Sequence, residues 1–168
     1  MISTVVFALV AGISGPQLSG LNQSVVAQVP KDNPRRIYQL RNLERVKIKI
    51  GKHEFNPWVM DTDGKRQEGM MWLTNADFKD SDAMIFMYGE EFQMSFWMRN
   101  TLVDLDIAFV NSKNQIVRTV TMKRLDETLV PSRKPAKYAI EFKAGLLKKL
   151  GITEGMTVNV PATVKSKD

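Results

Sequence analysis

The sequence contains no cysteine and a single histidine, His53. The absence of cysteine excludes disulfides, thiol nucleophiles and zinc–thiolate sites. One histidine is too few for a metal site built from two or three imidazoles. A serine triad would also have no histidine other than His53 to use as its base. A chain of 168 residues with 43% hydrophobic residues can still form a core without disulfides, so the missing cysteines do not argue against export.

Charged side chains are missing from the first 30 positions. Residues 31–50 carry a net charge of +5 and residues 51–168 carry +1, so the overall +6 is concentrated ahead of the domain. A nucleic-acid surface would place basic side chains on the folded part, interleaved with aromatics. The distribution therefore argues against a nucleic-acid partner.

Residues 1–13 form an apolar run, too short for a bilayer span of roughly 20 residues. The run matches the apolar region of a signal peptide, and Val25-Val26-Ala27 supplies small residues for cleavage after Ala27. No Lys or Arg precedes it, which departs from the usual pattern. We expect residues 1–27 to be a signal peptide or membrane-anchoring leader, and the protein to be exported: periplasmic, extracellular or membrane-tethered.

Residues 28–45 form a basic linker, expected as a solvated tether or, with the leader retained, as a segment lying on anionic lipid. Residues 46–162 are expected to form a β-rich domain, and residues 163–168 a charged tail. Alternating and continuous apolar runs predict the strands. They are Val46–Ile50, His53–Met60, Ala83–Tyr88, Gln93–Met98, Leu105–Val110, Ile116–Met122, Tyr138–Phe142 and Thr157–Val160.

Two short helices are expected, from Asp61 or Thr62 to about Met70 and over Ala144–Leu150. Gly89-Glu90-Glu91 is expected to be a turn, and residues 125–136 a loop. The fold class is thus α+β, mainly β. We expect a compact single-domain, barrel-like or sandwich-like sheet of about seven to eight short strands with two short helices.

The segment Gln93–Ile107 has the most unusual composition. Strand alternation places Phe96 between two methionines on a core face and puts Trp97, Arg99 and Thr101 on the other face. An indole beside a guanidinium suits a pocket wall that recognises an anion, so we take Trp97, Arg99, Asn100 and Thr101 as candidate ligand-binding residues. The alternative is a capping cluster in which Arg99 pairs with a nearby aspartate and Asn100 closes a turn.

Three carboxylates are weaker candidates for catalysis. Asp104 and Asp106 flank Leu105, which would set them roughly 6–7 Å apart on one strand face. Such a pair could hold a hard cation or divide acid and base roles, and Glu141 could join it. The alternative for the aspartates is turn bonding and pairing with Arg99.

Methionine is abundant between residues 60 and 98, which hold seven of the ten. Thioethers suit Cu(I), so a copper site built from methionines is a lesser alternative, although methionine also fills irregular cores. His53 alone is more typical of a structural position than of a ligand or catalytic base.

Five segments of the domain follow one another in this order: GMM at 69–71, AMIFMY at 83–88, SFWMRNTLVDLDIAFV at 95–110, QIV at 115–117 and YAIEFKAGLLKKLGITEGMTV at 138–158. Together they resemble the domain-of-unknown-function-192 family of bacteria and archaea, over about residues 46–160. The resemblance implies a compact β-rich fold with short helices, commonly behind a signal peptide or lipid anchor. Its motif positions fall on Gly69, Met70, Phe96, Trp97, Met98, Asn100, Thr101, Asp104 or Asp106, Glu141 and Gly145.

The family carries no settled activity, so the resemblance implies no catalytic role. Gly-Met-Met stands where Leu usually precedes the motif's methionine, and the long loop lacks the cysteine of some members. We therefore expect an exported, non-catalytic module that binds a small ligand or an exported protein partner, without a cofactor. The alternatives are a carboxylate-dependent hydrolase using Asp104, Asp106 or Glu141, and copper binding through methionines.

Overall fold

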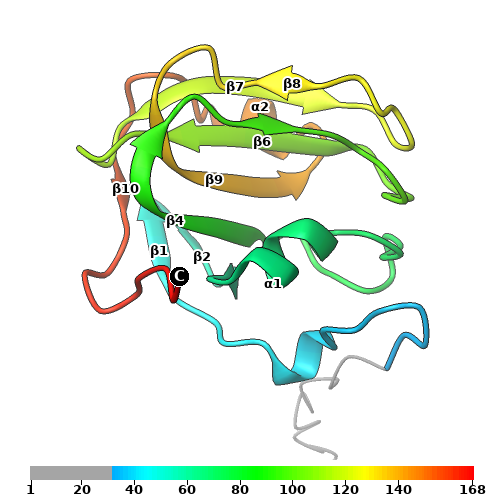
Figure 1. Cartoon of the computed structure of the whole chain (residues 1–168). Helices are drawn as coiled ribbons and strands as arrows, with labels where there is room; N and C mark the ends of the chain where they lie inside the picture. Colours follow the sequence, from blue (N-terminus) through cyan, green and yellow to red (C-terminus); the bar gives the residue numbers. More distant parts are fainter. Residues whose placement is uncertain (1–31) are drawn as a thin grey trace, which may run out of the picture.

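The computed structural model describes residues 32–168, which form a mainly β domain (Figure 1). The helices are η1 (Leu40–Asn42, a 3-10 helix), α1 (Asp63–Glu68) and α2 (Leu146–Leu150). The strands are β1 (Ile48–Ile50), β2 (His53–Phe55), β3 (Trp58–Met60), β4 (Met84–Phe92), β5 (Ser95–Phe96), β6 (Leu105–Val110), β7 (Ile116–Met122), β8 (Val130–Pro131), β9 (Ala136–Lys143) and β10 (Val158–Asn159). The predicted leader, residues 1–27, and the start of the predicted linker, residues 28–31, lie outside the described part.

A five-stranded sheet in the order β3-β4-β9-β6-β7 is the centre of the domain. β3 runs parallel to β4, and the other neighbours are antiparallel. A three-stranded sheet, β10-β1-β2, and a two-stranded sheet, β5-β8, accompany it. The arrangement is sandwich-like, without a closed barrel among residues 32–168. It confirms the predicted fold class, with ten strands in the described residues rather than seven to eight.

Both faces of β6, inside the central sheet, are buried. On β6, Leu105, Ile107 and Phe109 enter a first core, which also includes η1 and the segment around β5. Ala108 and Val110 enter a second core, shared with the three-stranded sheet and α2. A strand buried on both faces reads as a continuous apolar run, which is why β6 begins and ends where the sequence predicted. The half-buried β7 also has the predicted bounds.

Several predicted boundaries differ from the structure; the predicted strand Gln93–Met98, for example, is confined to Ser95–Phe96. Two other differences change how the strands are paired. β4 does not end at a turn over Gly89-Glu90-Glu91 but continues to Phe92, with a bulge in its pairing to β9. The outer half of β4 is exposed on both faces, so backbone pairing holds it and no apolar pattern marks it. The predicted single strand His53–Met60 is divided near Pro57, because β2 and β3 belong to different sheets.

Both ends of the described chain pack on the domain. Leu40 and Leu43 lie in the first core, and the Arg36 side chain is almost wholly buried. Residues from Arg36 onward are therefore part of the domain, which differs from the solvated tether that the sequence predicts for 28–45. At the other end, Lys167 donates its backbone N–H to the Asp61 carbonyl at 2.8 Å.

None of the helices in residues 32–168 has the length and apolar composition to cross a membrane.

Candidate functional site

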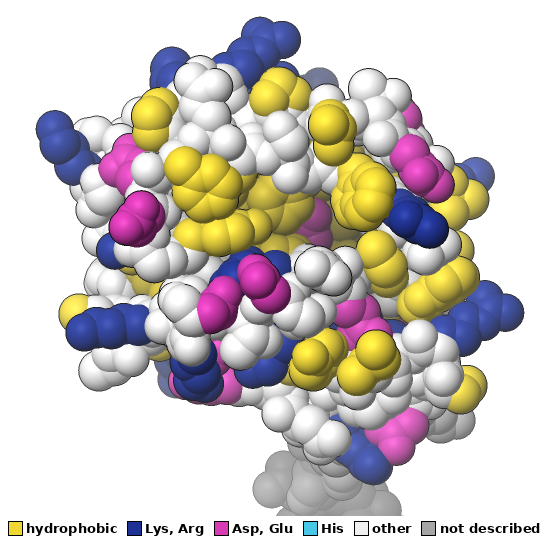
Figure 2. Space-filling model, viewed as in Figure 1, with side chains coloured by type: hydrophobic (Ala, Val, Ile, Leu, Met, Phe, Trp, Pro, Cys, Tyr) yellow, Lys and Arg dark blue, Asp and Glu magenta, His cyan; other side chains and the backbone are white. Residues whose placement is uncertain are grey.

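A cleft of about 220 Å³ opens on the face of the sheet that carries α1. Figure 2 shows this hollow, with hydrophobic side chains around it and an acidic side chain in its depth. Its walls come from α1 and the residues after it, from β4, from the segment after β5, and from β9. The lining consists of Asp63, Arg66, Gln67, Glu68, Gly69, Met70, Met71, Phe86, Tyr88, Ser95, Phe96, Trp97, Arg99, Thr101 and Glu141.

The predicted polar face of the Gln93–Ile107 segment lies in this cleft. Trp97, Arg99 and Thr101 line it together, while Met98 is 1% exposed in the first core. Trp97 keeps 42% of its surface exposed, and the Arg99 guanidinium lies 5.5 Å from the indole centroid. The alternation in sequence thus separates the buried Met98 from Trp97 and Arg99, while Phe96 belongs both to the first core and to the cleft wall.

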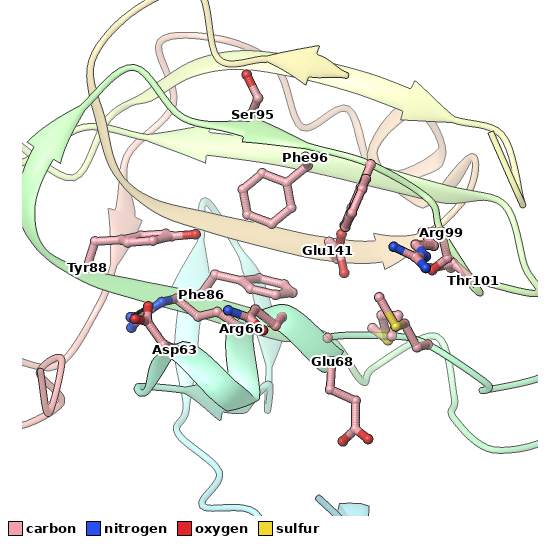
Figure 3. Close-up of a pocket in the computed structure, with 15 residues that line it drawn as sticks. Asp63, Arg66, Glu68, Phe86, Tyr88, Ser95, Phe96, Arg99, Thr101 and Glu141 are labelled. Carbon is pink, nitrogen blue, oxygen red and sulfur yellow. Dashed lines mark hydrogen bonds and ion pairs between the residues drawn. The ribbon is translucent and has the colours of Figure 1, made fainter. Parts of the chain in front are cut away.

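Glu141 projects from the middle of β9 toward the space between Phe86, Phe96 and Arg99 (Figure 3). Its side chain is buried, and its ladder neighbours on the same face are Met84 and Ile107. No group in residues 32–168 donates a hydrogen bond to its carboxyl. Burial alone raises the pKa of Glu141 from its ordinary value to about 8, which favours the neutral carboxyl.

The opposite wall is formed by Tyr88 and Arg66. The Arg66 guanidinium lies 4.7 Å from the Tyr88 ring centroid and donates to the Met87 carbonyl at 2.8 Å. Burial raises the pKa of Tyr88 above its ordinary value. The wall therefore offers an aromatic ring with a neutral hydroxyl, backed by a fixed cation.

The rim after α1 is held by Arg36, from the segment that precedes the predicted domain. Arg36 donates to the carbonyls of Gly69 and Met71 at 2.8 and 2.6 Å, and lies 3.3 Å from a Glu68 oxygen. Gly69 has φ +45°, and a Cβ there would lie 3.1 Å from the Phe86 ring. A side chain at position 69 would thus strain the turn and press on the cleft wall.

Asp104 does not reach the cleft. Its carboxylate accepts the Arg124 backbone N–H at 2.9 Å and pairs with Lys123 at 3.1 Å. These two bonds hold the pKa of Asp104 below its ordinary value. The turn-bonding alternative describes this residue, with Lys123 rather than Arg99 as its partner.

Asp106 is buried on the other face of the sheet. It accepts the Thr121 hydroxyl at 2.7 Å and the Leu147 backbone N–H at 3.1 Å, which ties β6 to β7 and to the first turn of α2. The expected pair of aspartates on one strand face is not formed, because β6 begins only at Leu105 and Asp104 belongs to the preceding loop. Neither aspartate joins Glu141.

Asn100 and His53 also lie outside the cleft lining. Asn100 adopts a left-handed conformation with φ 55°, and its carbonyl accepts the Trp72 N–H at 2.9 Å. It closes the turn that carries the chain from Arg99 to Thr101, which is a positioning role for its neighbours. His53 approaches the Leu150 carbonyl at 3.2 Å and helps to join β2 to α2.

The methionines of the copper alternative are mostly core residues. Met70, Met84, Met94 and Met98 share the first core with aromatic side chains, and all four are at least 97% buried. Thioethers packed among Phe side chains act as adaptable apolar filling. Within residues 32–168, no group of three or more His, Asp or Glu side chains is placed to hold a metal ion.

The sequence did not identify the second half of the cleft. Phe86 and Tyr88 looked like ordinary strand residues, and nothing around Arg66 marked it as a wall residue. One signal was present at Glu141, because a carboxylate inside the apolar run Tyr138–Phe142 is unusual for a buried strand.

Comparison with known proteins identifies the fold and the family. A protein of unknown function from Novosphingobium aromaticivorans DSM 12444 is similar, with a TM-score of 0.67 and 28% identity over 80% of this chain and 94% of that chain. A protein from Sinorhizobium meliloti 1021 described as a putative transcription regulator has a TM-score of 0.65 and 24% identity, over 70% of this chain and 94% of that one. The second likeness is one of fold alone.

No curated protein matches the chain. The family described as Uncharacterized ACR matches residues 46–160, which include every strand of the central sheet and the whole segment from β5 to Thr101. The chain therefore belongs to the domain-of-unknown-function-192 family.

Proposed function

We propose that the protein is an exported or membrane-tethered domain that binds a small ligand or a protein partner in the cleft, without catalysing a reaction. The observation that carries the proposal is the contrast between the mouth and the floor. Trp97 and Arg99 are exposed at the mouth, and a buried carboxyl without a hydrogen-bond partner lies at the floor. Large aromatic area with a few convergent polar groups is the usual composition of a ligand site.

The hydrolase alternative receives less support. It needs two carboxylates that converge on one reacting atom, with separate acid and base roles. Asp104 and Asp106 are bonded elsewhere, so Glu141 would have to act with Asp63 or Glu68. Asp63 pairs with Arg66, and Glu68 accepts the backbone N–H groups of residues 37 and 38 at 2.6 and 2.9 Å.

A thermal-shift experiment on the full chain tests the binding proposal. The probes are acetate, phosphate, glucose, acetamide and γ-aminobutyrate, each at increasing concentration. We expect at least one probe to raise Tm by several degrees, because a ligand that binds only the folded state stabilises it by mass action. The shift should be lost in Trp97→Ala and weakened in Arg99→Gln.

Lys148→Gln is the matched control, because Lys148 is also an exposed cation but lies on α2, away from the cleft. A probe that shifts the wild type and the two cleft variants equally would show binding elsewhere and contradict the proposal. So would the absence of any shift with all five probes.

Localisation is tested separately, by fractionating cells that express the full chain. We expect a product in the periplasmic, secreted or membrane fraction, because residues 1–27 have the composition of a leader. A cytoplasmic product of full mass would contradict export and leave the binding proposal untouched.

A further inference from the structure

Most charges around the cleft are already neutralised by the protein itself. Arg66 pairs with Asp63 and with Asp168 from the C-terminal segment. Glu68 pairs with Arg36. A ligand gains little by contacting these side chains, because each is held by a partner of opposite sign.

Two ionisable side chains of the cleft, Arg99 and Glu141, have no such partner in residues 32–168. Arg99 lies at the mouth, and no carboxylate in residues 32–168 is within salt-bridge distance of it; its close charge contact is the Trp97 ring. Glu141 lies at the floor, buried and without a hydrogen-bond donor in the described chain. A purely anionic ligand would satisfy the first and leave the second unpaired, whereas a purely cationic ligand would satisfy the second and be repelled at the mouth.

The cleft also has aromatic walls. Phe86 and Phe96 meet edge to face with centroids 5.0 Å apart, and Tyr88 and Trp97 complete the lining. Ring faces attract an ammonium group, most strongly where water is excluded. An ammonium group on the way to Glu141 would therefore pass surfaces that favour it.

We infer that the cleft takes a small zwitterion, with its ammonium group against Glu141 and its carboxylate or phosphate at Arg99. The inference rests on the proposed function and names the chemical class of the ligand. A cavity of about 220 Å³ suits a molecule of the size of an amino acid. The ligand supplies the partners that the chain does not give to either group.

Binding of an ammonium group changes the protonation of the floor. The charged and titratable groups that line the cleft beside Glu141 are Asp63, Arg66 and Glu68 on α1, Tyr88 on β4 and Arg99 after β5, and the Glu68 carboxylate points away from Glu141 (Figure 3). Burial raises the pKa of Glu141 to about 8, because the carboxyl is desolvated. An ammonium group stabilises the carboxylate instead, so binding below pH 8 releases one proton, and affinity rises as pH increases toward 8.

Calorimetric titration of the full chain tests the inference, with glycine, β-alanine, γ-aminobutyrate and ε-aminocaproate as probes. Butylamine and butyrate are the single-ended controls for γ-aminobutyrate. We expect at least one amino acid of the series to bind at least tenfold more tightly than either control. Its affinity should rise severalfold from pH 6 to pH 8, with a limit of tenfold per pH unit for release of one proton.

Two variants separate the contributions of Arg99 and Glu141 to binding of the two ends of the ligand. Arg99→Gln should reduce the affinity for the best amino acid to that of the amine. Glu141→Gln should abolish the rise with pH, because an amide does not titrate, and should reduce the affinity for the best amino acid to that of the alkanoate. Lys148→Gln should leave both affinity and pH dependence unchanged, and circular dichroism checks that each variant is folded.

The zwitterion is contradicted if butyrate or butylamine binds as tightly as the best amino acid, if the affinity for that amino acid falls from pH 6 to pH 8, or if no amino acid of the series binds. Cleft-dependent binding of phosphate or glucose alone would also overturn it, but would leave the binding proposal standing. A complete lack of binding by all probes would overturn both.

Discussion

Two buried carboxylic acids on neighbouring strands of the central sheet have opposite surroundings. Asp106 pairs in the ladder with Phe142, and Glu141 pairs with Ile107, so the two acids occupy adjacent rungs and face opposite cores. Asp106 accepts two hydrogen bonds from the protein. Glu141 accepts none from residues 32–168, although both side chains are at least 96% buried.

The comparison distinguishes a buried carboxylate that serves the structure from a buried carboxyl whose hydrogen-bonding capacity is unused. A buried carboxylate that is fully hydrogen-bonded organises the groups around it and has nothing to offer a ligand. A buried carboxyl without a partner lowers the stability of the fold, and such groups are candidates for a functional site. Substitutions at the two positions should therefore have opposite effects on stability.

The largest expected effect is the pH dependence of stability caused by Glu141. Its folded-state pKa of about 8 lies above the ordinary 4.5, so the folded protein binds the proton more tightly than the unfolded chain. The stabilisation of the folded protein by this tighter proton binding is fully present below pH 4.5 and is lost as the pH rises to about 8. At about 1.4 kcal/mol per pKa unit, the loss is roughly 5 kcal/mol in the free energy of unfolding.

Urea unfolding of wild type and Glu141→Gln at pH 5, 6, 7 and 8 measures this loss. The variant should lose less stability than the wild type across this range and be the more stable protein at pH 8. Glu90→Gln, at an exposed position on β4, is the control and should follow the wild type. Parallel curves for wild type and Glu141→Gln would show that the Glu141 carboxyl is not desolvated.

Asp106→Ala should destabilise the protein at pH 7 by about 3 kcal/mol. The substitution leaves the Leu147 N–H buried without a partner, at a cost of about 1–3 kcal/mol, and removes the bond from Thr121. Urea unfolding at pH 7 gives the value. A change below about 0.5 kcal/mol would contradict the structural role assigned to Asp106.

Thr121→Val removes one of the two bonds to Asp106 and keeps the shape of the side chain. The hydroxyl donates to Asp106 Oδ1 at 2.7 Å from an exposed position on β7. Water can replace it, so we expect a loss of about 1 kcal/mol. The same unfolding experiment applies, and a loss as large as that of Asp106→Ala would mean that the Leu147 bond contributes little.

The sequence predicted the parts of the fold that hydrophobic patterning controls. β6 has the predicted bounds because all its side chains are buried, and the half-buried β7 has the predicted bounds as well. The outer half of β4 and the short strand β8 were missed, since backbone pairing defines them and their side chains are largely exposed. Arg36 was placed in a linker because its partners, the carbonyls of Gly69 and Met71, are more than 30 residues away.

The same distinction applies to the candidate site. Parity along the predicted strand grouped Trp97, Arg99 and Thr101, which follow the end of β5 in the structure, and an acid in an apolar run marked Glu141. That these residues meet across one cleft depends on which strands are neighbours, and the sequence does not contain that information in local form. Asp104 and Asp106 were grouped by the same parity argument, which failed because the strand starts between them.

The smallest expected effect on stability is that of Arg99→Gln. Arg99 is exposed, and its close charge contact is the Trp97 ring, so the free energy of unfolding should change by less than about 0.5 kcal/mol. Urea unfolding of the ligand-free protein measures it, beside Lys148→Gln. A loss above about 1 kcal/mol would mean that Arg99 has a structural partner, and the mouth of the cleft would then have no free cation. A near-zero change, together with weaker binding of the best amino acid, would show that Arg99 serves the ligand rather than the fold, as an unpaired Glu141 does at the other end.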